Sequence, residues 1–86
     1  MKAAKRVAWN LRRLRVDRKL SQESLAVDSN VDVSYISRLE SGIENPTVGL
    51  LEKLAAALNE DVSAFLLIPP KGDKKPAPLK SGRRPK

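Results

Sequence analysis

The sequence has no cysteine and no histidine, and its aromatic residues are limited to one Trp, one Tyr and one Phe in 86 residues. The absence of cysteine excludes disulfides and thiolate metal sites, and the absence of histidine removes the commonest general base and zinc ligand. A chain of this length buries only about 60–65% of its unfolded surface, so an enclosed catalytic cleft is not expected. Carboxylates and lysines remain available for catalysis, but we predict a protein that is not an enzyme and needs no metal or cofactor.

Long apolar runs are also absent, since the longest, residues 64–68 and 54–58, have five residues each. Nothing in the sequence is long enough to span a bilayer, and the first residues contain no apolar stretch typical of a signal peptide. We therefore predict a cytoplasmic location and no membrane partner.

Charge, by contrast, is abundant and uneven. The net charge is +7, and residues 1–19 carry eight cations against Asp17 alone. Residues 20–68 carry two cations against eight acids, whereas residues 69–86 carry seven cations against Asp73. A basic protein of this kind favours a polyanionic partner, either nucleic acid or an anionic membrane surface.

The periodicity of the apolar residues predicts an all-α fold, a compact bundle of about five short helices. We expect helices over residues 3–18, 22–28 and 33–41, a fourth from Thr47 to about Asn59, and a short fifth with Val62, Phe65 and Leu66 facing the core. Residues suited to cap helix starts precede four of them: Ser21, Asp32, Thr47 and Asp61. Composition changes at Pro69, so we predict a domain over residues 1–68 and a disordered basic tail rich in proline and lysine over residues 69–86.

The two short helices at 22–28 and 33–41, joined by a turn at Ser29-Asn30, have the plan of a helix-turn-helix. In such a unit the first helix places its N-terminus against phosphate, and the second presents its outer side chains to the DNA major groove, which is about 12 Å wide. Ile36 and Leu39 would hold the second helix to the core. Its outward positions are Val33, Ser34, Ser37, Arg38 and Ser41.

The segment from about residue 5 to residue 67 resembles the lambda-repressor-like, XRE-type helix-turn-helix DNA-binding domains of bacteria and phages. The matching residues are Leu11 with Arg15, Leu20-Ser21-Gln22 before Leu25-Ala26, the run from Ile36 to Gly42, Pro46, and the set Leu51, Leu54, Ala55 and Leu58.

The resemblance implies roles for individual residues. Val33, Ser34 and Arg38 match positions that contact bases, with Ser37 as a further candidate. Gln22 matches a phosphate-contacting glutamine, and Tyr35, Ser41 and Asn45 lie where the chain approaches phosphate. Arg15 and Glu40 match an ion pair that braces the first helix against the third. The sequence departs from the family at Lys19, Asn30 and Asn59, where glycine is frequent, and Asp28 and Asp32 bring negative charge near the expected DNA surface.

We accordingly predict a sequence-specific regulator of transcription that binds double-stranded DNA at an operator as a homodimer, since one short helix reads about half a site. Apolar residues near the end of the domain, together with Trp9, are candidates for the dimer interface; alternatively, Trp9 packs beside the fifth helix. Two other interpretations stay open. One is an antitoxin-like or adaptor module that binds a partner protein through the same fold, and the other is a nonspecific DNA-coating protein.

Overall fold

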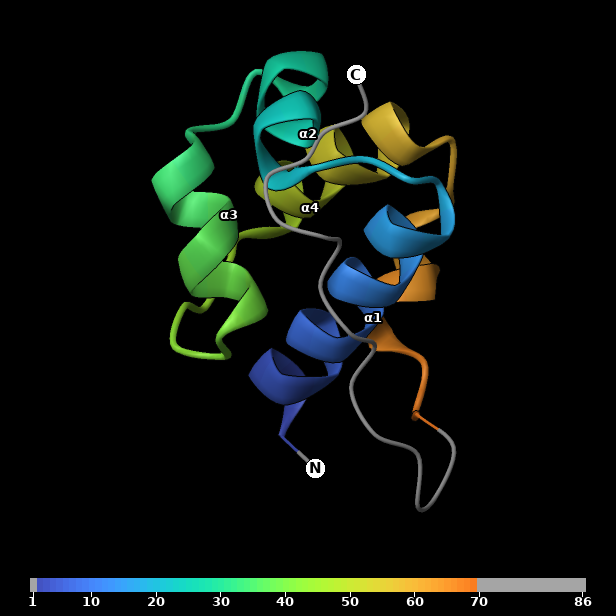
Figure 1. The fold of residues 1–86 in the computed structure, drawn as a ribbon. Coiled ribbons are helices and arrows are strands. Elements are labelled where there is room, and N and C mark those ends of the chain that lie inside the picture. Colours follow the sequence, from blue (N-terminus) through green and yellow to red (C-terminus); the bar gives the residue numbers. More distant parts are fainter. Residues whose placement is uncertain (1, 70–86) are drawn as a thin grey trace.

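The computed structural model describes residues 2–69, which form four α-helices and one short 3₁₀ helix (Figure 1). Their bounds are α1 Ala3–Asp17, α2 Gln22–Ser29, α3 Val33–Glu40, α4 Val48–Leu58 and η1 Val62–Leu66. The described residues contain no strand, and the all-α prediction is confirmed. Except for Pro69, the predicted tail lies outside the described residues.

Each of the four predicted caps is present at its helix start. The side chains of Ser21, Asp32, Thr47 and Asp61 accept hydrogen bonds from the backbone N–H groups of Ser24, Ser34, Leu50 and Ser63. Each bond satisfies an amide that has no partner within its own helix. The starts of these four elements are thus fixed by local chemistry.

The four α-helices also end in the same way, with a residue in the left-handed region at Lys19, Asn30, Gly42 and Asn59. In each case its N–H and the following N–H donate to carbonyls at the end of the helix, as in Gly42 N to Leu39 O (3.0 Å) and Ile43 N to Arg38 O (3.3 Å). This pair of bonds is the Schellman motif. Three of these positions are those at which the sequence lacks the glycine that the resemblance leads one to expect.

A single apolar core joins the helices. Helix α1 packs against α3 and η1, α2 packs against α3 and α4, and α4 also contacts η1. In Figure 1, α3 lies at one side of the bundle, so one face of it is open. The large apolar side chains that are fully buried come from all five elements: Leu11, Leu25, Ile36, Leu39, Leu54, Leu58 and Phe65.

The structure corrects the prediction for Leu66 and decides between the two alternatives for Trp9. Leu66 was expected to face the core but is 42% exposed. In a 3₁₀ helix, which has three residues per turn, Val62 and Phe65 share a face and Leu66 turns away from it. Trp9 is buried within the chain, with the Arg13 guanidinium 5.7 Å from its ring, which favours packing inside the domain over a partner interface.

Candidate nucleic-acid interface

Helix α3 divides its side chains between the core and the surface. Ile36 and Leu39 are buried, and Glu40 is buried beside them with no exposed area. The opposite face is exposed and carries Ser34, Ser37, Arg38 and Ser41, while Val33 is half-buried at the start of the helix. Small and polar residues on this face leave the helix free to approach a partner closely.

The turn before α3 fixes its direction relative to α2. Asn30 adopts φ 59° and ψ 40°, so the chain reverses within a few residues. Val31 is buried, which anchors the turn to the core, and the Ser29 hydroxyl donates to the Leu25 carbonyl oxygen at 2.7 Å. Asp32 is exposed, but its carboxylate accepts from Ser34 N at 3.0 Å. Part of the charge of Asp32 is therefore offset by the first turn of α3.

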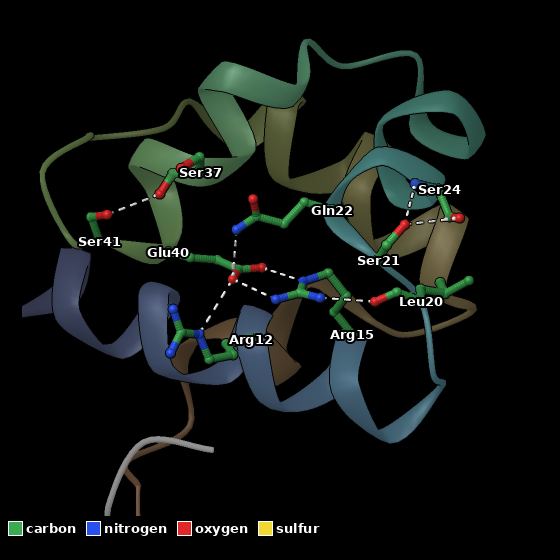
Figure 2. Close-up of polar contacts among 9 residues, drawn as sticks. All are labelled: Arg12, Arg15, Leu20, Ser21, Gln22, Ser24, Ser37, Glu40 and Ser41. Carbon is green, nitrogen blue, oxygen red and sulfur yellow. Dashed lines mark hydrogen bonds and ion pairs between the residues drawn. The ribbon is translucent and has the colours of Figure 1, made fainter. Parts of the chain in front are cut away.

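A network around the Glu40 carboxylate joins α1, α2 and α3 (Figure 2). Arg15 donates to it through two nitrogens, Nε to Oε2 at 2.6 Å and a terminal nitrogen to Oε1 at 2.8 Å. Arg12 Nε lies 3.4 Å from Oε1, and Gln22 Nε2 donates to Oε1 at 3.1 Å. A paired fork of this kind fixes orientation as well as distance. One buried carboxylate thus sets how three helices meet.

Arg38 is the outward-facing cation of α3, and among residues 2–69 its guanidinium contacts Glu44 and Tyr35. Its Nε donates to Glu44 Oε2 at 2.6 Å, and its central carbon lies 5.5 Å from the centre of the Tyr35 ring. The side chains of Arg38 and Glu44 are 47% and 28% exposed. Arg38 therefore stays accessible while one edge of its guanidinium is already occupied.

The four candidate phosphate contacts lie at different places around α3. Gln22 is the first residue of α2 and points its amide at Glu40. Tyr35 is half-buried under Arg38, and the Ser41 hydroxyl donates to the Ser37 carbonyl oxygen at 3.0 Å. Asn45 is exposed in the loop between α3 and α4. Ser41 and Asn45 are thus exposed, whereas Gln22 and Tyr35 are half-buried.

The sequence analysis missed three polar residues that shape this region. Arg12 joins the Glu40 network, and Glu44 holds Arg38. Asn10 is buried in α1, where its amide donates to the carbonyl oxygens of Phe65 at 3.0 Å and Leu67 at 2.8 Å. The sequence does hold a signal for Asn10, since this polar residue stands between Trp9 and Leu11 in an apolar part of the helix. A buried amide there needs hydrogen-bond partners.

Residues 2–69 show neither a metal site nor a membrane-spanning helix. No group of three or more acidic side chains in this range is arranged to hold a metal ion. No helix there combines the length and the apolar character needed to cross a membrane.

Comparison with known proteins assigns the fold to a family. Residues 11–65, from the middle of α1 into η1, match the helix-turn-helix family HTH_3. The chain belongs to this family of helix-turn-helix transcription regulators. Within it, α2, the turn at Asn30 and α3 form the helix-turn-helix unit, and the observed bend between the two helices agrees with this assignment.

Individual relatives agree with this result. The chain is 42% identical over 65 residues to a hypothetical transcription factor of Neisseria meningitidis, covering 74% of this chain and 59% of that protein. It is 37% identical over 60 residues to the immunity repressor protein of Bacillus phage phi105, covering 70% of this chain and 42% of that protein. The solved structure of the Neisseria transcription factor NHTF aligns with a TM-score of 0.76 at 35% identity, over 79% of this chain and 78% of that one. The chain therefore spans about half the length of the first two relatives.

Proposed function

We propose that this protein is a sequence-specific regulator of transcription that binds an operator in double-stranded DNA as a homodimer. The observation that carries the proposal is the division of α3: its buried face is fixed by Ile36, Leu39 and Glu40, and its outer face offers small polar side chains and one arginine. Such a helix fits the major groove, where base edges can be read. It acts in the cytoplasm by binding, not by catalysis.

In this proposal the outer face of α3 reads bases and its surroundings hold the phosphate backbone. The base-contacting residues are Val33, Ser34, Ser37 and Arg38, and the phosphate-contacting residues are Gln22, Tyr35, Ser41 and Asn45. Arg38 has a special place among the first group because an arginine can donate two hydrogen bonds to O6 and N7 of guanine. The cations of α1 add attraction to phosphate that does not depend on sequence.

A second copy of the chain would complete the site, because two recognition helices must meet successive major grooves about 34 Å apart. The exposed apolar segment Leu66–Ile68 supports this part of the proposal, since its three side chains are 42%, 54% and 72% exposed. Asn10 and the Arg6 guanidinium bond to backbone carbonyls of this segment and hold it against α1. A rigid apolar strip suits a symmetric contact between two copies.

Selection from a pool of randomised duplexes, followed by sequencing, tests the proposal. We expect enrichment of a palindrome with half-sites one helical turn apart. Arg38→Ala should weaken binding to the selected site by about 1–3 kcal/mol and relax the preference at one base position. Equal binding of all sequences, with affinity that falls steeply in salt, would instead indicate a nonspecific DNA-coating protein.

The rival function is an antitoxin-like or adaptor module that binds another protein. Val27, which is 80% exposed on α2 next to the exposed Asp28, favours this alternative because an apolar and acidic surface does not suit DNA. Val27→Ser separates the two functions: a DNA regulator should keep its site preference in this variant. Selection of no DNA sequence by the unmodified protein would favour the rival.

A further inference from the structure

The loop after α3 carries an acidic residue in an unexpected place. Glu44 lies beside the proposed DNA-reading face, where a carboxylate would repel phosphate, and its Oε2 accepts from Arg38 Nε at 2.6 Å. The turn at Gly42, with φ 82°, sends the chain back along α3 and brings Glu44 to Arg38, six residues earlier. This ion pair is partly exposed on both sides, and exposed pairs contribute little to folding stability. The main consequence of the ion pair is therefore its effect on the position of Arg38.

The contact determines which part of the guanidinium is available. The Nε–H edge faces Glu44, and the central carbon lies over the Tyr35 ring, 5.5 Å from its centre. Among the described residues, the bond to Glu44 is the only hydrogen bond made by the Arg38 side chain. The two terminal nitrogens therefore remain for a ligand, and they are the pair that can donate to guanine O6 and N7 together.

Without Glu44, Arg38 would have room to move. An open hollow of about 340 Å³ lies on this side of α3, lined by Tyr35 and Arg38 from α3 and by Leu50 and Lys53 from α4. The side chain of an arginine loses much rotational freedom when it is fixed in one orientation. A carboxylate that fixes it before binding removes that cost from the binding step.

We propose that Glu44 is a specificity-determining positioning residue, which holds Arg38 so that its terminal nitrogens meet a base edge instead of a phosphate. This inference rests on the proposed function. A phosphate binds an arginine through charge as well as through hydrogen bonds, and the carboxylate of Glu44 offsets the positive charge of Arg38. Guanine is uncharged and offers two acceptors in a fixed geometry, so binding to guanine depends on the orientation of the guanidinium and less on its charge. The pair thus lowers the affinity for DNA of any sequence and raises the discrimination between base pairs.

The test compares binding of the full chain to the duplex that the wild-type protein selects and to the same duplex altered at the base pair that Arg38→Ala relaxes. Fluorescence anisotropy gives both dissociation constants, and their ratio is the discrimination. A bidentate contact accounts for about 5- to 150-fold of such a ratio. In Glu44→Gln we expect the altered duplex to be bound as tightly as before or more tightly, and the ratio to fall by at least about 3-fold.

Two further proteins separate positioning from simple repulsion. Glu52→Gln removes an equivalent charge from the exposed surface of α4 and should keep the wild-type ratio. In an Arg38→Ala background, Glu44→Gln should leave the ratio unchanged, because there is no guanidinium left to orient.

Three results overturn the inference while the proposed function stands. The first is a gain in affinity for both duplexes by the same factor in Glu44→Gln, which would make Glu44 a repulsive charge only. The second is an equal change of ratio in the Arg38→Ala background. The third is a melting temperature of Glu44→Gln far below that of the wild type, which would make the residue structural. If the wild-type protein selects no duplex, the proposed function fails and this inference fails with it.

Discussion

Replacing Glu40 with leucine is expected to lower the free energy of unfolding by about 3–5 kcal/mol. Glu40 has no exposed area, and the Arg15 side chain is 4% exposed. Removing the carboxylate leaves the Arg15 guanidinium buried with the Leu20 carbonyl oxygen, 2.8 Å away, but with no acidic partner among its described contacts. A domain of this size has roughly 3–10 kcal/mol of stability in total. The loss is therefore a large part of the total, and the variant should unfold at a much lower urea concentration than the wild type.

Removing the other partner should cost less. Arg15→Met leaves Glu40 in contact with Arg12 and Gln22, so we expect a loss of roughly 2–3 kcal/mol. The double variant Arg15→Met with Glu40→Leu replaces both members of the buried pair with apolar side chains, and Arg12, which loses its contact with Glu40, keeps 24% of its side chain exposed. Its loss should be smaller than that of Glu40→Leu alone, since paired apolar replacements of buried ion pairs are often tolerated.

Urea unfolding followed by far-UV circular dichroism measures all three variants. Asp17→Asn is the matched control, because it breaks an exposed pair with Arg13 at 3.7 Å in which the Asp17 side chain is 62% exposed; it should cost less than about 0.5 kcal/mol. A loss below about 1 kcal/mol for Glu40→Leu would refute the reasoning. So would a double variant whose loss equals the sum of the two single losses.

Three further changes have expected outcomes. Gly49→Ala should raise the free energy of unfolding by about 0.5–1 kcal/mol in urea, because an added Cβ meets only Thr47 Oγ1 at 3.9 Å. Asn10→Ala should lower it by about 2–3 kcal/mol, because two buried or part-buried hydrogen bonds are lost. The hydrogen bond from the Ser63 hydroxyl, and then that from its N–H, lower the pKa of Asp61 from 3.8. The unfolded chain therefore binds a proton at Asp61 more readily than the folded chain does. The stabilisation by this cap is complete above about pH 4 and is lost as the pH falls through the lowered pKa. In Asp61→Asn the free energy of unfolding should therefore depend less on pH below about pH 4.

Each of these outcomes has a result that contradicts it. Gly42→Ala is the control for Gly49→Ala, because φ at Gly42 is 82° and a side chain there is strained; equal effects would contradict the argument from backbone geometry. For Asn10, a loss no larger than that of an exposed substitution would show that the two carbonyls find other partners. For Asp61, an unchanged acid profile would mean that the cap does not contribute.

The parts of the fold predicted correctly from the sequence depend on local chemistry. A serine, threonine or aspartate before an apolar period sufficed to place four helix starts, because a cap bonds within three residues of itself. The left-handed end at Lys19 carried no such signal, since lysine does not favour that region. Only the resemblance marked the position as one where glycine is frequent, and the structure supplies the physical reason.

Contacts between residues far apart in the sequence could not be predicted from local patterns. Asn10 bonds to carbonyls more than 50 residues away, and no periodicity reports such a partner. The pair between Arg38 and Glu44 depends on the turn at Gly42 and on two rotamers. Leu66 was misplaced because an α-helical period was applied to a segment that is a 3₁₀ helix. Contact between Arg15 and Glu40 was expected only because the family has such a pair.

The buried network explains how an eight-residue helix is held in a fixed orientation. A helix of that length is not stable alone, and α3 has only Ile36 and Leu39 as buried apolar anchors. Glu40 adds a third anchor of another kind, since a carboxylate held by a two-nitrogen fork resists rotation in a way that an apolar contact does not. The same carboxylate orients Gln22 at the start of α2. An apolar residue at position 40, with a matching change at Arg15, would fill the space. It would not replace the hydrogen bonds through which Glu40 joins α2 and α3 to α1.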